Sequence, residues 1–205
     1  MTVDHQDQTR LTISRLAAGL FWERGVSATS GDDIARAAGL STRTIWRYFR
    51  TKESCVEPLL AKSAGRFIAM LDRWPSELSL GDHLADDAIA HPLTPQDVDD
   101  EISAMRISTM TATEPALRTA YLMVHDDLER GFIPVIGRRL GLPDDDLTVR
   151  LCAAAVTGAF RVIDEDVSRT IVVDGRVVTQ QEALALIDRA ILDATNGRLG
   201  GPVTP

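Results

Sequence analysis

Apolar residues recur along most of the chain at the spacing of one helical face. Near the start, the positions i, i+3, i+4, i+7 and i+8 are filled by Ile13, Leu16, Ala17, Leu20 and Phe21. Similar segments follow, separated by glycine, proline and acidic breaks, and they add up to about nine helices. The pattern therefore predicts an all-α fold.

Residues 31–50 have the pattern of two short helices. Thr29 and Ser30 can cap the first helix, whose first turn holds acidic residues that suit the helix dipole. Ser41 or Thr42 can cap the second helix.

The connection between these two helices carries the residue types that a helix-turn-helix needs. Ala35 is small enough for the second helix to cross closely above it. Gly39 can adopt the left-handed conformation of a sharp turn, and Ile45 fills the junction. These three positions together predict a helix-turn-helix.

One segment departs from helical spacing. TIVVDGRVVT, at 170–179, places Asp174-Gly175 between two β-branched runs, which is the usual signal of a tight hairpin. An irregular loop fits the same residues, so both interpretations stay open.

The patterns divide the chain into four parts. A polar arm at 1–8 and a Gly/Pro-rich tail at 197–205 are expected to be mobile. Between them lie a helix-turn-helix domain at 9–54 and a larger helical domain at 55–196.

Charge is divided unevenly along the chain. Lys+Arg total 22 against 30 Asp+Glu, yet no acidic residue occurs from Ile34 to Lys52. On a helical wheel, Arg43, Arg47 and Arg50 occupy one narrow arc opposite the apolar positions. Planar guanidinium groups suit guanine edges and phosphates, so this face is predicted to bind DNA. A solvated basic surface is the alternative.

Four motifs occur between about Ile13 and Leu60. FWERG closes the first helix, DDIARAAG precedes the turn, STRTIWRYF forms the second of the short helices, and TKE opens the next helix. This segment, about a quarter of the chain, resembles the DNA-binding domain of the tetracycline-repressor (TetR) family. The resemblance implies a ligand-responsive repressor that binds a palindromic operator as a dimer. Such a repressor is released when a small, mostly apolar ligand enters its C-terminal domain.

The resemblance also implies roles for single residues. The start of the recognition helix meets base edges, Lys52 binds phosphate, and the residues before the second helix bind phosphate through hydroxyl and N–H groups. For the aromatic residues, packing of a short helix is an equal alternative to DNA contact. The expected DNA contacts are Thr29, Ser30, Thr42, Arg43, Thr44, Trp46, Arg47, Tyr48 and Lys52.

The segments 149–167 and 181–195 are apolar on two faces. A surface helix needs only one apolar face, so the second face must be covered. A second copy of the chain is the expected cover, which gives a homodimer with a four-helix interface. The alternative is that other helices of the same chain cover both faces.

A ligand site is expected in the larger helical domain, although its residues would also serve as plain core. Arg106 falls on a stripe expected to face the core, traced by Ile102, Met105, Thr109 and Met110. It would pair with Asp126 or Glu101, or await an anionic ligand. The candidate lining is Phe67, Met70, Trp74, Met105, Arg106, Met110, Tyr121, His125 and Phe160.

Other functions are disfavoured by what the sequence lacks. It has no GxSxG, HExxH, GxGxxG or phosphate-binding loop, and its four histidines are unclustered, so neither an enzyme nor a metal or cofactor site is expected. Cys55 and Cys152 are expected to be reduced thiols, with a disulfide as the alternative. No charged-then-apolar leader opens the sequence and no apolar run approaches the roughly 18 residues of a membrane span, so a cytoplasmic protein is expected. A regulator that answers a protein partner, or no ligand, remains the second hypothesis.

Overall fold

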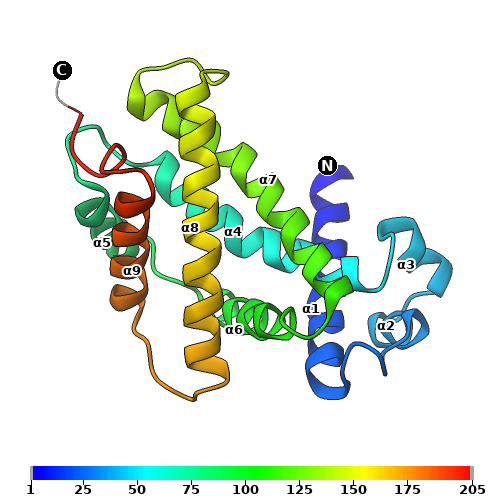
Figure 1. Cartoon of the computed structure of the whole chain (residues 1–205). Coiled ribbons are helices and arrows are strands. Elements are labelled where there is room, and N and C mark those ends of the chain that lie inside the picture. The colour runs from blue at the N-terminus through cyan, green and yellow to red at the C-terminus, as the bar shows by residue number, and fades with distance from the viewer. Residues whose placement is uncertain (1, 204–205) are drawn as a thin grey trace. The chain divides into compact units, whose positions relative to one another are not determined.

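The computed structural model describes residues 2–203, with side chains from Gln6 onward (Figure 1). No strand occurs in this described part, and its nine α-helices confirm the all-α prediction. The elements are α1 (Thr2–Arg24), α2 (Gly31–Ala38), α3 (Thr42–Tyr48), the 3-10 turn η1 (Glu53–Val56), α4 (Glu57–Asp72), α5 (Leu80–Ala90), α6 (Pro95–Met110), α7 (Pro115–Leu140), α8 (Leu147–Val172) and α9 (Gln180–Ala194). None of the helices within 2–203 is long and apolar enough to cross a membrane.

The helices group into two compact units. Unit 1 comprises Met1–Ser63 and Pro95–Val124, and unit 2 comprises Ala64–Thr94 and His125–Pro205. The helices α4 and α7 therefore contribute their first parts to unit 1 and the rest to unit 2. This grouping differs from a linear division at residue 54, because α6 and the start of α7 cluster with the N-terminal helices.

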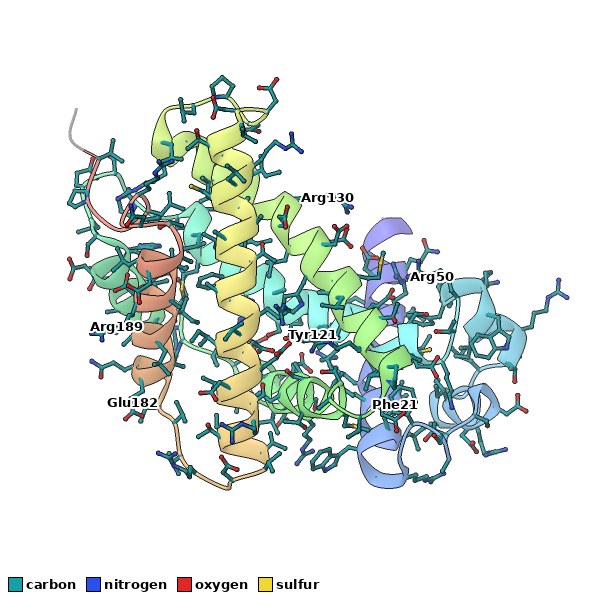
Figure 2. All side chains as sticks on the ribbon, in the orientation of Figure 1. Phe21, Arg50, Tyr121, Arg130, Glu182 and Arg189 are labelled. Atoms are coloured by element: carbon teal, nitrogen blue, oxygen red, sulfur yellow. The ribbon has the colours of Figure 1, made fainter. Side chains whose placement is uncertain are left out.

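Unit 1 is built on α1, which packs against α2, η1 and α6. The predicted stripe of α1 faces inward, since Ile13, Ala17 and Phe21 are buried (Phe21 is labelled in Figure 2). Ser14 lies beside them, and its hydroxyl oxygen accepts a hydrogen bond from the Leu59 N–H of α4 (3.0 Å). A buried polar side chain thus fixes the start of α4 against α1.

Unit 2 has an aromatic centre. Phe67 of α4 stacks on Phe160 of α8, with ring centroids 4.8 Å apart, and meets Phe132 of α7 edge-on at 5.9 Å. Both geometries are favourable for aromatic pairs, so these rings hold the three helices together. The helix α9 packs against α5 and α8 (Figure 1).

In the segment 170–179, the end of α8 is followed by an irregular loop. The structure therefore agrees with the loop interpretation and not with the hairpin. The helix α8 continues through Val172, because its helical periodicity takes up the first β-branched run. The loop returns from there, with Gly175 at φ +65° and Arg176 N–H donating to Thr170 O (3.0 Å).

Both segments that are expected to be mobile contain described structure. The helix α1 already begins at Thr2, within the predicted arm at 1–8. In the predicted tail, Leu199 is buried and the backbone is bonded to unit 2: Leu80 N–H donates to Gly200 O (3.0 Å) and Val203 N–H to Ser76 O (2.8 Å). One buried leucine and a few backbone bonds thus attach residues 197–203 to unit 2, and the mobility of the tail stays a prediction.

Candidate DNA-binding surface

The turn between α2 and α3 is formed by backbone and cap interactions. Gly39 lies at φ +65°, in the left-handed region that glycine tolerates, and its N–H donates to Arg36 O. The Ser41 hydroxyl accepts a hydrogen bond from Thr44 N–H (3.2 Å) and caps α3. Ile45 is fully buried at the junction. This geometry matches the predicted helix-turn-helix.

The outward face of α3 is basic. Arg43 and Arg47 are exposed, and neither forms an ion pair with any described carboxylate. Together with Thr44 and Trp46 they line a shallow, open hollow on the surface. The helix packs on unit 1 through Ile45, and Phe49 just beyond it is also buried. Burial of Ile45 and Phe49 on one side of α3 therefore leaves the guanidinium groups of Arg43 and Arg47 on the solvent-exposed side.

Arg50 does not extend this basic arc, contrary to the helical-wheel prediction. The helix ends at Tyr48, because Phe49 adopts an extended conformation (φ −134°, ψ 146°). The Arg50 guanidinium, labelled in Figure 2, donates instead to the Glu57 carboxylate of α4 (2.9 Å). The basic arc consists of Arg43 and Arg47.

The two aromatic residues of α3 pack against neighbours and stay partly exposed. Trp46 is 44% exposed, and its indole covers Gly31 at the start of α2. Tyr48 is half-buried, and the Arg47 guanidinium lies 5.2 Å from the centroid of its ring. Each of the two side chains is therefore partly buried by packing, and its exposed part is available to contact a ligand.

Gly31→Ala is expected to displace the Trp46 indole and to lower the free energy of unfolding by about 1 kcal/mol. A Cβ at Gly31 would lie 2.2 Å from Trp46 Cζ2, so the ring has to move. Gly19→Ala in α1 is the matched control, because no atom lies within 4 Å of its added Cβ. This control is expected to raise stability by about 0.5–1 kcal/mol. Urea unfolding checks both, and equal changes would contradict the predicted contact.

Of the residues before α2, Ser30 is exposed and Thr29 is buried. Ser30 caps α2 in a capping box with Asp33, and its hydrogen bonds lower the pKa of the Asp33 carboxyl to about 2. The Thr29 hydroxyl donates to Gly25 O (2.9 Å), and its N–H donates to Val26 O (3.2 Å). Both Thr29 donors are thus used inside the loop, so phosphate binding through them does not fit this arrangement.

Lys52 and Thr42 also have partners within unit 1. Lys52 Nζ donates to Val26 O (2.6 Å) and Thr29 O (2.8 Å), which ties the start of η1 to the loop before α2. An ammonium group has three donors, so one remains for another acceptor. The Thr42 hydroxyl donates to the Asp32 carboxylate (2.5 Å) and links α3 to α2.

A buried ionic cluster was not predicted from the sequence. The Asp100 carboxylate of α6 accepts hydrogen bonds from Arg15 Nε (2.7 Å) and Nη2 (2.8 Å) of α1 and from Lys62 Nζ (2.6 Å) of α4. Lys62 also bonds Asp97 (2.7 Å). Burial raises the pKa of Asp100, but the bonds from the two cations outweigh it and lower that pKa to about 2. The pair Asp97 and Asp100, three positions apart, was the only sequence signal.

The nine candidate ligand residues divide between the two units. Phe67, Met70, Trp74, His125 and Phe160 belong to unit 2, and Met105, Arg106, Met110 and Tyr121 to unit 1. In unit 2, the ring centroid of the buried His125 lies 6.4 Å from that of Phe160. In unit 1, Tyr121 is fully buried (Figure 2).

The residues that α6 buries are not those of the core-facing stripe predicted from the sequence. The buried residues of α6 are Asp100, Ala104, Ile107 and Ser108, whereas Ile102 is exposed. The helix is turned because the paired Asp100 faces inward. Arg106 consequently lies over the Trp22 ring of α1, 5.1 Å from its centroid, and not against Asp126 or Glu101 as expected.

Comparison with known proteins agrees with this geometry. The model described as "Bacterial regulatory proteins, tetR family" matches residues 13–59, and the model described as "MftR C-terminal domain" matches residues 87–188. The family consists of transcriptional regulators and not of enzymes. Together the two models cover the N-terminal helices and most of the remaining helical region.

Three curated proteins show the range of similarity. MftR of Mycobacterium tuberculosis, named for regulation of mycofactocin biosynthesis, is 36% identical over 72 residues (35% of this chain, 36% of MftR). The repressor KstR2 of Rhodococcus jostii is 43% identical over 51 residues, or 25% of each chain. The chain thus matches only about a quarter to a third of the length of these two. The regulator TcmR of Streptomyces glaucescens is 26% identical over 197 residues (94% of this chain, 84% of TcmR).

Solved structures show the same fold. A tetR-family regulator from Streptomyces coelicolor has a TM-score of 0.55 at 20% identity, with 95% of this chain and 83% of that chain covered. FadR from Bacillus subtilis, solved in complex with stearoyl-CoA, has a TM-score of 0.52 at 20% identity, with 91% and 98% covered. The helix-turn-helix geometry, the two matching models and this shared fold lead to one conclusion: the chain belongs to the tetR family of bacterial regulatory proteins.

Proposed function

We propose that this regulator is a transcriptional repressor that binds a palindromic operator as a homodimer in the cytoplasm. The observation that carries the proposal is the exposed pair Arg43 and Arg47, which has no described carboxylate partner and stands over the buried Ile45. Arginine is suited to bidentate contacts with guanine and to phosphate. The acidic remainder of the chain would repel DNA, so this face is the favoured contact.

The proposed contacts follow from where each side chain lies. Arg43 and Arg47 meet base edges, because both are exposed on the face of α3 opposite the buried Ile45. Thr42 and Thr44 meet base edges beside them, in the first turn of α3. Phosphates are bound by Ser30 at the start of α2, by the free donor of Lys52, and by the exposed parts of Trp46 and Tyr48. Thr29 supports Ser30 from within the loop. The proposed DNA-binding domain corresponds to residues 9–54.

The dimer would form through α8 and α9. On α8, Leu151 (61% exposed) and Val162 (54%) lie on the outward face, while Val149 and Val156 are buried inside unit 2. On α9, Leu186 is 42% exposed on the face away from the buried Ile191. The chain thus leaves the second apolar face of both helices uncovered, and a second copy is the occupant that a two-fold operator requires.

The effector is proposed to be a small, mostly apolar molecule bound in the helical region at 55–196. FadR, a protein of the same fold, was solved with an acyl-CoA, and a ligand of that kind pairs an apolar chain with a charged part. Of the candidate residues in unit 2, Phe67 and Phe160 stack on each other, and His125 lies near Phe160. Control by a protein partner, or no effector, is the second hypothesis.

Binding of the intact protein to DNA from upstream of its own gene tests this function. Fluorescence anisotropy should show preference for a near-palindromic site over scrambled DNA, with log K falling linearly with log salt. Equal affinity for both DNAs would contradict sequence-specific repression. A thermal-shift screen of apolar and anionic compounds separates the two effector hypotheses, since a compound that raises Tm supports a ligand.

A further inference from the structure

Arg139 of α7 is a buried charge that holds the C-terminal segment. It is 8% exposed, yet no carboxylate among residues 6–203 forms an ion pair with it. Its guanidinium donates to Pro75 O (2.7 Å), Leu78 O (2.7 Å) and Gly201 O (2.8 Å). The same group lies 3.7 Å from the centroid of the Trp74 ring, and its Nε, also buried, has no hydrogen-bond partner.

This environment stabilises a cation incompletely. Carbonyl dipoles and an aromatic face partly replace water, but the positive charge has no counterion and one N–H group is unsatisfied. Burial accordingly lowers the pKa of Arg139 from its ordinary value. An anion that reached this guanidinium would make a charge-assisted, bidentate contact stronger than that of a neutral carbonyl.

An apolar pocket adjoins the guanidinium and is closed by the tail. Leu199 is buried there and leaves a void of only about 10 Å³. Arg139 is the one charged residue of the lining, which otherwise consists of Leu71, Trp74, Leu80, Val135, Ile136, Val156, Ile191 and Leu199. The tail therefore presents an isobutyl group to an apolar pocket and a carbonyl oxygen to a guanidinium.

The segment that closes the pocket is weakly held. Besides the bond from Arg139, two backbone bonds tie it to residues 76–80, from Leu80 N–H to Gly200 O and from Val203 N–H to Ser76 O. At its start, next to α9, Gly197 N–H donates to Leu192 O and Arg198 N–H to Thr195 O. It contains Gly197, Gly200 and Gly201, and glycine loses more conformational entropy on ordering than any other residue. A competing ligand can thus displace it.

We propose that this pocket is a binding site for aliphatic carboxylates, which displace residues 197–203. The carboxylate takes the place of Gly201 O on Arg139, and the alkyl chain takes the place of Leu199. The proposal deepens the effector part of the proposed function. Calorimetry measures binding of the carboxylate itself. The pocket proposal can therefore fail while operator binding is confirmed, and operator binding can fail while the pocket proposal is confirmed.

Octanoate is the probe, titrated by calorimetry into the full chain and into a chain that ends at Asn196. The shortened chain is expected to bind octanoate at least about tenfold more tightly, because the competing segment is gone. Octanol and octylamine, matched in chain length, are expected not to bind. Unchanged affinity after shortening, or octanol binding as well as octanoate, would overturn the proposal.

A matched pair of variants tests the role of the guanidinium. Arg139→Met in the shortened chain is expected to abolish octanoate binding. Arg138→Met is the control, because Arg138 is the neighbouring residue and is exposed, paired with Asp72. Loss of binding in both variants, or in neither, would contradict the assignment.

The full chain provides a second readout if the shortened chain does not fold. Saturating octanoate should speed hydrogen exchange of the Val203 and Leu80 amides, whose acceptors are lost when the tail leaves. Leu199→Ala should tighten octanoate binding while the backbone bonds of the tail remain. Amide protection that octanoate leaves unchanged would refute displacement.

Discussion

Asp100→Asn is expected to lower the free energy of unfolding by about 3 kcal/mol, measured by urea unfolding at pH 7. The carboxylate side chain is 5% exposed and is the shared partner of Arg15 and Lys62, whose side chains are about a third exposed. Without the negative charge, two cations remain in a partly buried site. The loss therefore exceeds that of a surface ion pair, which is about 0–1 kcal/mol.

The effect of Asp100→Asn depends on pH in a defined direction. The pKa of Asp100 is lowered in the folded protein to about 2, so its stabilising contribution is complete above the ordinary value near 3.8. Below that value the contribution declines, and the difference between parent and variant should shrink by about 1 kcal/mol at pH 3. Asp99→Asn, the exposed neighbour, is the control and should stay within about 0.5 kcal/mol of the parent. If Asp100→Asn and Asp99→Asn changed the free energy of unfolding equally, the Asp100–Arg15–Lys62 cluster would not stabilise the fold.

The double variant Arg43→Ala, Arg47→Ala is expected to lower operator affinity about a hundredfold, since each bidentate base contact contributes about 1–3 kcal/mol. Both side chains are exposed and carry no described intramolecular ion pair, so folding should be unaffected. Fluorescence anisotropy at fixed salt gives the affinity, and circular dichroism checks the fold. Arg43→Ala alone should also reduce the ratio of the affinity for operator DNA to the affinity for scrambled DNA.

A control variant distinguishes loss of DNA contacts from loss of positive net charge as the cause of lower operator affinity. Arg176 is exposed in the loop after α8, and Arg176→Ala removes one positive charge far along the chain from α3. It should bind the operator within about twofold of the parent, because Arg176 lies outside the proposed DNA-binding domain and salt screens the charge of an exposed side chain. A double variant that also binds within twofold would contradict the proposed contacts.

The helix-turn-helix could be predicted because its determinants are local. A cap at Ser30, a left-handed glycine at 39 and a buried Ile45 act within a few residues, and each lies where its residue type predicts. The end of α3 was not predicted, because no breaker follows Tyr48 and the apolar spacing continues. Burial of Phe49 in an extended conformation ends the helix two residues before the predicted end at residue 50.

Interactions across long sequence separations escaped prediction. Lys52 bonds carbonyls more than 20 residues away, and Asp100 joins Arg15 across 85 residues. No spacing rule reveals such pairs, since they depend on how helices pack. The attachment of the tail has the same origin: its composition carries no signal for it, whereas Leu199 packs in a pocket lined by residues of the five helices α4, α5, α7, α8 and α9.

The most direct test of α3 as the DNA-reading element is tethered cleavage. Arg47→Cys, labelled with iron-EDTA, places a cutting reagent on α3, while Cys55 and Cys152 are buried and burial raises the pKa of Cys55 to about 12. On operator DNA selected from a random pool, cuts should fall in two clusters related by two-fold symmetry and separated by a whole number of helical turns of about 10–10.5 base pairs. Scattered cuts, or the same pattern from labelled Arg176→Cys, would contradict the placement of α3 in successive major grooves.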